Sequence, residues 1–590
     1  MKKYFIILLV VISMFSIFNV HAETSAEPPM FLLGQNEIAE VIISGKATSL
    51  ENGKNPIQLI TASEGRKLIL CAGETKNSGE IVQGASLRIL APDFQKYEKT
   101  FHCESALTAY TLNNDLTAIW LATKGGTIDK AIVQPKVYRV NLGTFEVTEV
   151  TLDSIPCNVE ISEDGQWLAV AELGGAETPY SILTLYDANS MAPAGRFEIS
   201  KNPGALFFSD DNQTIIVAGY GYKYHEGFTI PTAYSVKLEQ QPVAAGVDII
   251  DLPSLASKKI DLGFINNELI FGNKGTLYGI ISEEANNDTN DIDVETNQEA
   301  KGNVKAIGFE GLLWEQECDF APKFVQERPA TEQVWIGGGK KIRIIDKPTG
   351  KILKDITVPN EIKPFLFLEN HAYAYAYAYA YNMNKRKLNI MHLNNLLIED
   401  TLAVGSTGFA AFKAMLVVAS FANYYNSIQP QYVNGVRMPT NVQPIFWVHS
   451  PKGNIVACPE KNKLYMLNSF LAQIHTYDML TGKVDKKLSN FGQNSLYLQM
   501  APNGKYVILV SGDGWKLISV DTDKSVLNFN PSGASVRLAF QAAEAPVPYF
   551  SPDGKRMYIP DNSKITVIDL ENAKKLPNLK SETKDAMICW

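Results

Sequence analysis

One short turn motif recurs along the chain and constrains its fold more than any other feature. In each copy, small and acidic residues precede a Gly or Asn, and an apolar run follows. The clearest copies are Ser551–Gly554 (SPDG), Ala501–Gly504 (APNG) and Ser162–Gly165 (SEDG). Neighbouring copies lie about 40 to 50 residues apart, which is the repeat length of a propeller blade or another stacked unit.

The chemistry of the motif predicts a tight hairpin. Pro presets φ at the first turn position, Asp or Asn bonds its own backbone, and Gly adopts a positive φ. A second strand pair follows each hairpin, with an alternating strand that ends in Asp, as at Asp346 and Asp478. The tract Ala372–Tyr381 alternates Ala and Tyr, so we expect it to form one of these strands. Each unit is therefore a four-stranded meander, and the fold class is all-β, a β-propeller.

Two segments carry a resemblance to known families. The stretch SPDGKRMYIPDNSKITVIDLENAKKL, from Ser551, resembles the bacterial YVTN-type and WD-repeat-like propellers. The Asp-x-x-Thr-Gly-Lys turns at 346–351 and 478–483 are similar to those of quinoprotein-type propellers. No unit carries the Trp that closes the repeat of quinone-dependent alcohol dehydrogenases, and the Gly-His and Trp-Asp signatures of WD repeats are missing. The resemblance therefore implies the propeller fold over most of the chain but no bound quinone.

The number of units bears on domain organisation. Eleven unit centres fall between residues 65 and 554, more than the 4 to 8 blades that are usual in one propeller. We expect two tandem propellers, over residues 23–315 and 316–590, with a boundary inside 305–325. The alternative is one large ring with inserted hairpins.

The N-terminus predicts export. Lys2 and Lys3 precede an apolar run over 5–18, and Val20-His21-Ala22 matches a cleavage site, so residues 1–22 form a secretory signal peptide cut after Ala22. An uncleaved anchor is the alternative. We expect a soluble mature protein in the periplasm or outside the cell, with no membrane span. Export permits disulfides, but the six scattered cysteines favour isolated buried thiols.

Five segments interrupt the repeat, between the second and third strand of their units: 73–84, 123–136, 219–246, 283–303 and 422–442. In a meander these loops share one face, and the SPDG-type turns lie on the other. We expect the loop-rich face to hold a protein, peptide or glycan partner. Aromatic rings and polar donors suited to such contacts are Tyr220, Tyr222, Tyr224, His225, Tyr424, Tyr425, Tyr432 and Arg437. Alternatively, the tyrosines cover sheet edges.

Motifs for catalysis or metal binding are sparse. The sequence holds no G-x-S-x-G, no phosphate-binding G-x-x-x-x-G-K-[ST] and no H-E-x-x-H. The weak metal candidates are Asp288, Asp291, Asp293 and Glu295, in an acidic segment that lacks the Gly of a calcium loop. We therefore predict no metal and no cofactor, with Ca²⁺ and a quinone left open.

Charge and motifs together favour one function over another. The formal charge of −9 excludes nucleic acid as a partner, because phosphate binding needs a basic surface. The sequence predicts an exported, non-catalytic binding protein. The alternative is a propeller enzyme, a lactonase-like hydrolase or a quinoprotein-like oxidoreductase, with a metal or cofactor in a central channel.

Overall fold

The structure is a computed structural model of the whole chain. It describes residues 30–33, 38–43, 46–51, 53–62, 66–76, 78–174, 178–220, 244–263, 269–271, 275–282, 301–328, 331–358, 366–370, 375–382, 387–392, 397–403, 432–433, 436–437, 452–453, 455–468, 473–481, 483–488, 495–511, 514–529, 548–561, 564–581 and 587–589. The expected signal peptide lies outside the described residues.

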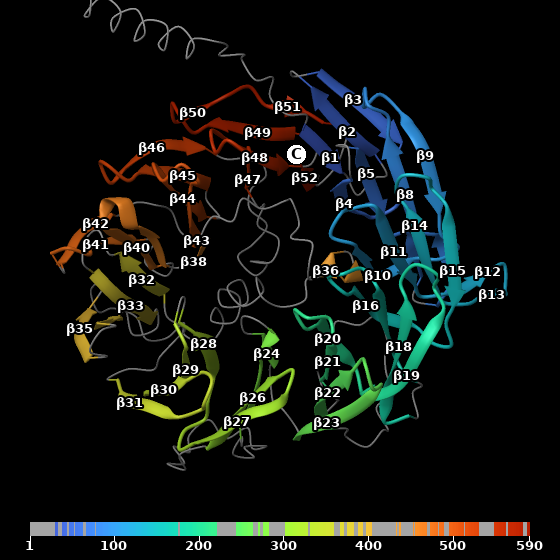
Figure 1. Cartoon of the computed structure of the whole chain (residues 1–590). Coiled ribbons are helices and arrows are strands. Elements are labelled where there is room, and N and C mark those ends of the chain that lie inside the picture. The colour runs from blue at the N-terminus through green and yellow to red at the C-terminus, as the bar shows by residue number, and fades with distance from the viewer. Residues whose placement is uncertain are drawn as a thin grey trace, which may run out of the picture.

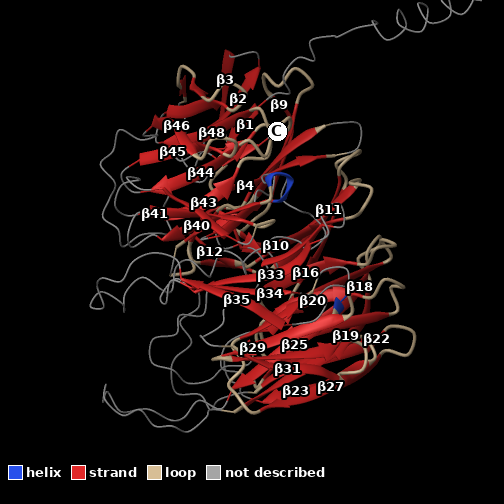
Figure 2. Cartoon of the chain, turned by 90° about the vertical axis from the view of Figure 1, so that its left-hand side faces the viewer, coloured by secondary structure: helices blue, strands red, loops and turns tan. Residues whose placement is uncertain are grey.

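Strands account for most of this part of the chain (Figure 2), and turns and loops join them, with a short 3₁₀ helix, η4 (Pro459–Lys461). Most strands form antiparallel meanders, which we number as sheets in chain order. Sheet 1 holds β4 (Pro56–Thr61), β5 (Lys67–Cys71), β8 (Ser86–Leu90) and β9 (Tyr97–His102); sheet 2 holds β10 (Leu107–Leu112), β11 (Ala118–Thr123), β14 (Lys136–Asn141) and β15 (Val147–Thr151); sheet 3 holds β16 (Pro156–Ile161), β17 (Trp167–Glu172), β18 (Tyr180–Asp187) and β19 (Pro193–Ser200); sheet 4 holds β20 (Pro203–Phe208), β21 (Thr214–Gly219), β22 (Ala245–Asp251) and β23 (Ala256–Gly263); sheet 5 holds β24 (Leu269–Phe271), β25 (Leu277–Ser282), β26 (Gly302–Gly308) and β27 (Gly311–Cys318).

The second half continues the pattern. Sheet 6 holds β28 (Phe324–Glu327), β29 (Gln333–Gly338), β30 (Lys341–Asp346) and β31 (Ile352–Thr357); sheet 7 holds β32 (Leu366–Asn370), β33 (Tyr375–Asn382), β34 (Lys387–His392) and β35 (Leu397–Ala403); sheet 8 holds β39 (Ile455–Cys458), β40 (Lys463–Asn468), β41 (Gln473–Asp478) and β42 (Lys483–Leu488); sheet 9 holds β43 (Ser495–Met500), β44 (Tyr506–Ser511), β45 (Gly514–Ser519) and β46 (Lys524–Phe529), with β38 (Lys452–Gly453) on its β43 edge; sheet 10 holds β47 (Tyr549–Phe550), β48 (Arg556–Asp561), β49 (Lys564–Asp569), β50 (Lys574–Lys575) and β51 (Leu579–Lys580). The expected strand in the Ala/Tyr tract is confirmed by β33.

The sheets follow one another in chain order around a ring (Figure 1), with the first strand of each meander toward the centre. The predicted all-β fold of four-stranded meanders is confirmed, and the arrangement is propeller-like. A further sheet, which we call the closing sheet, holds β3 (Lys46–Glu51), β2 (Ile38–Ile43), β1 (Met30–Leu33) and β52 (Met587–Cys589) in that order. Its β1 and β52 pair antiparallel, so the two ends of the described chain meet in one sheet.

The recurrent turns have the predicted geometry. Gly165, Gly504 and Gly554 have φ of 72°, 66° and 67°, and each donates its N–H to the carbonyl three residues earlier, at 2.8 to 2.9 Å. In the SPDG copy the Ser551 hydroxyl donates to Asp553 at 2.5 Å. The unit expected around residue 413 lies outside the described residues. The closing sheet was not predicted.

The turns between third and fourth strands supply a first prediction. The residue four positions after the end of the third strand has a positive φ in several sheets. Sheet 6 has Gly350 there (φ 68°), whereas sheet 4 has Leu255 (φ 54°), which is 43% exposed. Because Asn tolerates this left-handed region better than Leu, Leu255→Asn should stabilise the protein by about 0.5–1 kcal/mol in urea unfolding. The control is Leu353→Asn, at a 46% exposed position on β31, where no gain is expected; equal gains from both would refute the argument.

Apolar side chains fill the space between neighbouring sheets. One cluster joins the closing sheet to sheets 1 and 2, others join each sheet to the next from 2 to 6, and further clusters join 8 to 9, 9 to 10, and 10 to the closing sheet. Trp335 and Phe367 join sheets 6 and 7 through an edge-to-face contact, with 5.0 Å between the centroids of their aromatic rings. The hydrophobic core is therefore distributed around the ring, as sheet-on-sheet layers.

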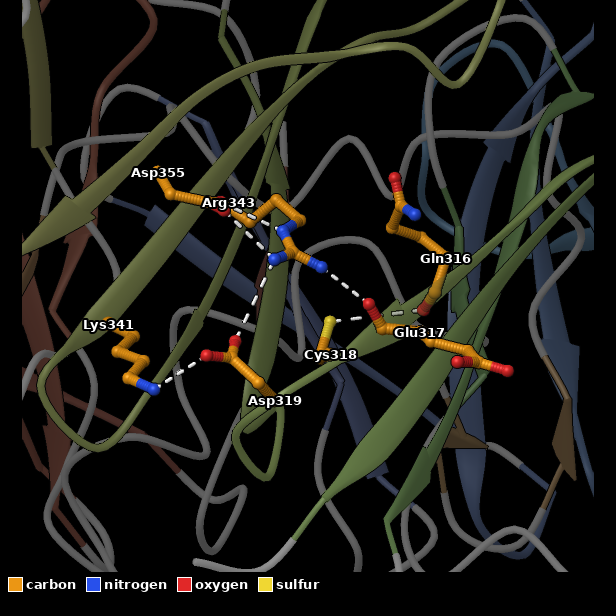
Figure 3. A network of polar contacts seen from close by, with 7 residues as sticks. All are labelled: Gln316, Glu317, Cys318, Asp319, Lys341, Arg343 and Asp355. Carbon is orange, nitrogen blue, oxygen red and sulfur yellow. Dashed lines mark hydrogen bonds and ion pairs between the residues drawn. The ribbon is translucent and has the colours of Figure 1, made fainter.

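The predicted boundary segment, 305–325, covers the end of β26, all of β27 and the start of β28, so it runs from sheet 5 into sheet 6, and the expected division between residues 315 and 316 lies inside β27. The apolar cluster at this junction includes Trp314 and Phe320 from one side and Ile336 from the other. A polar network also crosses it (Figure 3): the Arg343 guanidinium donates to Asp355 at 2.8 and 2.9 Å and to the Glu317 carbonyl, and Lys341 donates to Asp319 at 2.7 Å. These contacts pack the two sheets closely. The division into two propellers stays a prediction.

Candidate functional site

Four of the five expected insertions occupy the predicted place. Segments 73–84, 123–136, 219–246 and 283–303 each lie between the second and third strands of sheets 1, 2, 4 and 5. Because strands in a meander alternate in direction, these connections share one face of the ring, opposite the SPDG-type turns. Two insertions form hairpins in the described part of the chain: β6 (Glu74–Thr75) with β7 (Ile81–Gln83), and β12 (Gly126–Ile128) with β13 (Ala131–Val133).

The two hairpins contact each other. Glu80 and Thr127 form a parallel β-bridge, and the Thr127 N–H donates to the Gly79 carbonyl at 3.0 Å. Gly126 makes this approach possible: its φ is 143°, and a Cβ there would lie 2.6 Å from the Gly79 oxygen. Insertions from consecutive sheets therefore form one surface, which we call the hairpin surface.

Hydrogen bonds fix the hairpins to the sheets beneath them. The Gly125 N–H donates to the Ser105 hydroxyl at 3.0 Å, and the Asn55 side-chain amide donates to the Gly73 carbonyl at 2.8 Å. Lys54 and Glu74 add an ion pair at 2.7 Å. These contacts hold both hairpins against the sheets.

Apolar side chains point outward from the hairpin surface. Directly opposite residues on neighbouring strands share a face of the sheet. Thr127 is opposite both Glu80 and Ile132, so these side chains share one face. Val82 shares it too, because it lies two residues after Glu80 on the same strand. Ile132 is 75% exposed and Val82 is 42% exposed, while the intervening Ile81 is buried. Ile128, at the tip of its hairpin, is 41% exposed. Branched apolar side chains in this setting are typical of a contact surface.

An ion pair and a partly buried lysine lie close to the hairpins. Lys76 and Glu80 form an ion pair at 2.9 Å, and burial lowers the pKa of Lys124. Below the hairpins, burial raises the pKa of Cys71 to about 11 and the pKa of Cys103 well above its usual range. Both thiols therefore stay protonated and unreactive at neutral pH.

The binding and metal residues predicted from the sequence are not the residues that form the hairpin surface. Tyr220 follows β21, and its aromatic ring packs against Gly204, where a Cβ would lie 1.7 Å from the ring, beside the apolar cluster of sheets 4 and 5. Tyr222, Tyr224, His225, Tyr424, Tyr425, Asp288, Asp291, Asp293 and Glu295 lie outside the described residues. Their binding roles stay predictions.

Tyr432 and Arg437 lie in a short hairpin, β36 (Tyr432–Val433) with β37 (Val436–Arg437), which follows sheet 7 in the chain. β37 pairs parallel with β10, where Arg437 is opposite Ala109. The hairpin therefore adds to the inner edge of sheet 2, toward the centre of the ring (Figure 1). The rest of the 422–442 insertion lies outside the described residues.

Sequence reasoning located the insertions but missed the side chains of the hairpin surface. The signal was present as short apolar runs between glycines, Ile81-Val82 before Gly84 and Ala131-Ile132-Val133 after Gly126. Neither run contains an aromatic residue.

Within the described ranges, no group of three or more His, Cys, Asp or Glu side chains could hold a metal ion. Cys71, Cys103, Cys157, Cys318 and Cys458 are free thiols. No helix in the same ranges is long and apolar enough to cross a bilayer.

No protein-family model and no curated protein matches the chain. Among solved structures, it is similar to a dihydro-heme d1 dehydrogenase, NirN (13% identity, TM-score 0.27, covering 74% of this chain and 77% of that one). It is also similar to hydrazine synthase of Kuenenia stuttgartiensis (12%, 0.28, 63% and 98%) and to AztD of Citrobacter koseri (12%, 0.26, 69% and 92%). Because these TM-scores are below 0.5, the similarities say nothing about what this chain binds or catalyses.

Proposed function

We propose that this chain is an exported binding protein that holds a protein or peptide partner on its loop-rich face. The observation that carries the proposal is the contact between the β6–β7 and β12–β13 hairpins, which presents Val82 and Ile132 to solvent. An enzyme would require converging reactive groups, whereas the hairpin surface presents branched apolar side chains beside the Lys76–Glu80 ion pair.

The free edge of the β12–β13 hairpin suggests how a partner would bind. Within the described residues β13 pairs only with β12, so its outer edge offers backbone donors and acceptors to an extended segment. Ile132 would then contact apolar side chains of that segment. A peptide with alternating apolar residues fits this surface best.

Site-specific photo-crosslinking in the native host tests the proposal. A benzophenone amino acid at position 132 should capture a partner, whereas the same group at Leu480, which is 59% exposed in a turn on the opposite face, should not. The captured protein should then bind the purified chain, and Val82→Asp with Ile132→Asp should weaken its Kd at least tenfold, about 1.4 kcal/mol. Equal capture at both positions, or an unchanged Kd, would refute the proposal.

A further inference from the structure

A pocket of about 450 Å³ lies between sheets 2 and 3, and none of the residues of the β6–β7 and β12–β13 hairpins lines it. Its walls come from the end of β15 and the connection to β16, and from β17, β18 and β19. Val150, Leu152, Pro193 and Ala194 supply apolar lining, while Glu172, Thr184, Tyr186, Arg196 and Asp153 supply polar groups. This volume is within the range of small-molecule sites.

Glu172 is the central polar group of this pocket. It ends β17 and is only 2% exposed. One carboxylate oxygen accepts the Ser154 N–H at 3.0 Å, and the other accepts the Thr184 hydroxyl at 3.1 Å. The Ser154 hydroxyl lies 3.5 Å from the first oxygen but also donates to the Leu173 carbonyl at 2.6 Å. A carboxylate can accept about four hydrogen bonds, so Glu172 retains capacity for a further donor.

The charges of the pocket favour a cation. The Arg196 guanidinium is paired with Asp153 at 2.6 Å, on the exposed side of the pocket. The Ser154 and Thr184 groups that donate to Glu172 are neutral, and Arg196 acts on Glu172 through its charge. Two carboxylates and one guanidinium leave the pocket with a net charge of −1. Burial is the main cause that raises the pKa of Glu172, and a bound cation would offset this cost.

Tyr186 completes the site. It is 4% exposed, and burial, together with the charge of Glu172, raises its pKa to about 12, so its aromatic ring stays neutral. A neutral phenol ring attracts ammonium groups through its π face. The apolar lining would cover a short alkyl chain.

We propose that this pocket binds a primary ammonium group carried on a short alkyl chain. The ammonium would donate to the Glu172 carboxylate, and its methylene groups would pack on Leu152 and Pro193. The same chemistry occurs in free alkylamines and in lysine side chains.

Titration calorimetry on the full chain tests this site with n-butylammonium as the probe. Binding should be saturable, while butyrate and butanol, which match its size, should not bind. Glu172→Gln keeps the size of the side chain and should weaken binding at least tenfold; Glu315→Gln, at a 41% exposed carboxylate on β27, should leave it unchanged. Circular dichroism and thermal unfolding establish that Glu172→Gln is folded.

A second titration identifies the source of the ammonium group. Tighter binding of acetyl-Gly-Lys-Gly-amide than of n-butylammonium indicates a lysine side chain, and the reverse order indicates a free amine; both results support the site. The proposal is overturned if n-butylammonium shows no saturable binding, if butyrate binds equally well, or if folded Glu172→Gln binds like the wild type.

Discussion

Ile588→Asp is expected to lower the free energy of unfolding by about 4 kcal/mol or more. Ile588 is fully buried on β52, opposite Leu32 of β1, in the apolar cluster that joins sheet 10 to the closing sheet. The substitution removes a buried apolar side chain and places an unpaired carboxylate there, and both changes are strongly destabilising. Urea unfolding followed by circular dichroism measures the loss.

Two further variants keep this prediction testable if Ile588→Asp does not fold. Ile588→Val removes one methylene and should cost about 0.5–1.5 kcal/mol. Val526→Asp, at a 44% exposed position on β46, should cost little. A cost for Ile588→Asp no greater than that for Val526→Asp would mean that β52 does not hold the chain together.

The same variants distinguish one ring from two propellers. In a single closed ring, the pairing of β1 with β52 and the apolar contacts across the 305–325 segment would couple both ends of the chain to the remaining sheets. Loosening β52 should then accelerate hydrogen exchange in β1 and in β48 and β49 together, and limited proteolysis should leave no stable half. A protease-resistant fragment over residues 23–315 would instead support two propellers.

Local chemistry explains how much of the fold was predictable. The turn at Ser551–Gly554 specifies its hairpin through Pro, Asp and Gly, within four residues, and its recurrence gives the unit length. The insertions stand out because they interrupt that spacing. Both features are local, so sequence alone places them.

Features that depend on distant residues were not predictable. The three residues of β52 carry no turn motif, and their partner lies more than 550 residues earlier. Arg343 lies in an alternating strand, KIRIID, and is buried. Its guanidinium donates hydrogen bonds to Asp355 of the neighbouring strand and to the Glu317 carbonyl of sheet 5. Glu172 likewise resembles an ordinary strand end. The candidate site likewise depends on contacts between residues that are far apart in the sequence. The face of the ring on which it lies was therefore predictable, but the side chains that form it were not.

Asp523→Asn should be among the most destabilising conservative substitutions in the chain, at about 2–3 kcal/mol. The Asp523 side chain is 2% exposed; it pairs with Lys463 at 2.8 Å and accepts the Tyr465 hydroxyl at 2.7 Å, joining sheets 8 and 9. Asn keeps the size of the side chain and tolerates the positive φ of 53°. The substitution therefore removes the charge alone, and it leaves Lys463 largely buried beside a neutral group.

A neighbouring ion pair supplies the matched control. Asp521 pairs with Lys461 at 2.9 Å across the same two sheets, but these side chains are 67% and 51% exposed. Water screens exposed pairs, so Asp521→Asn should change urea stability little. Combining Asp523→Asn with Lys463→Met removes both charges and should recover part of the loss, since the cost comes from the unpaired buried ammonium. Equal effects of Asp523→Asn and Asp521→Asn would show that burial does not strengthen the inner pair, and that apolar packing alone joins these sheets.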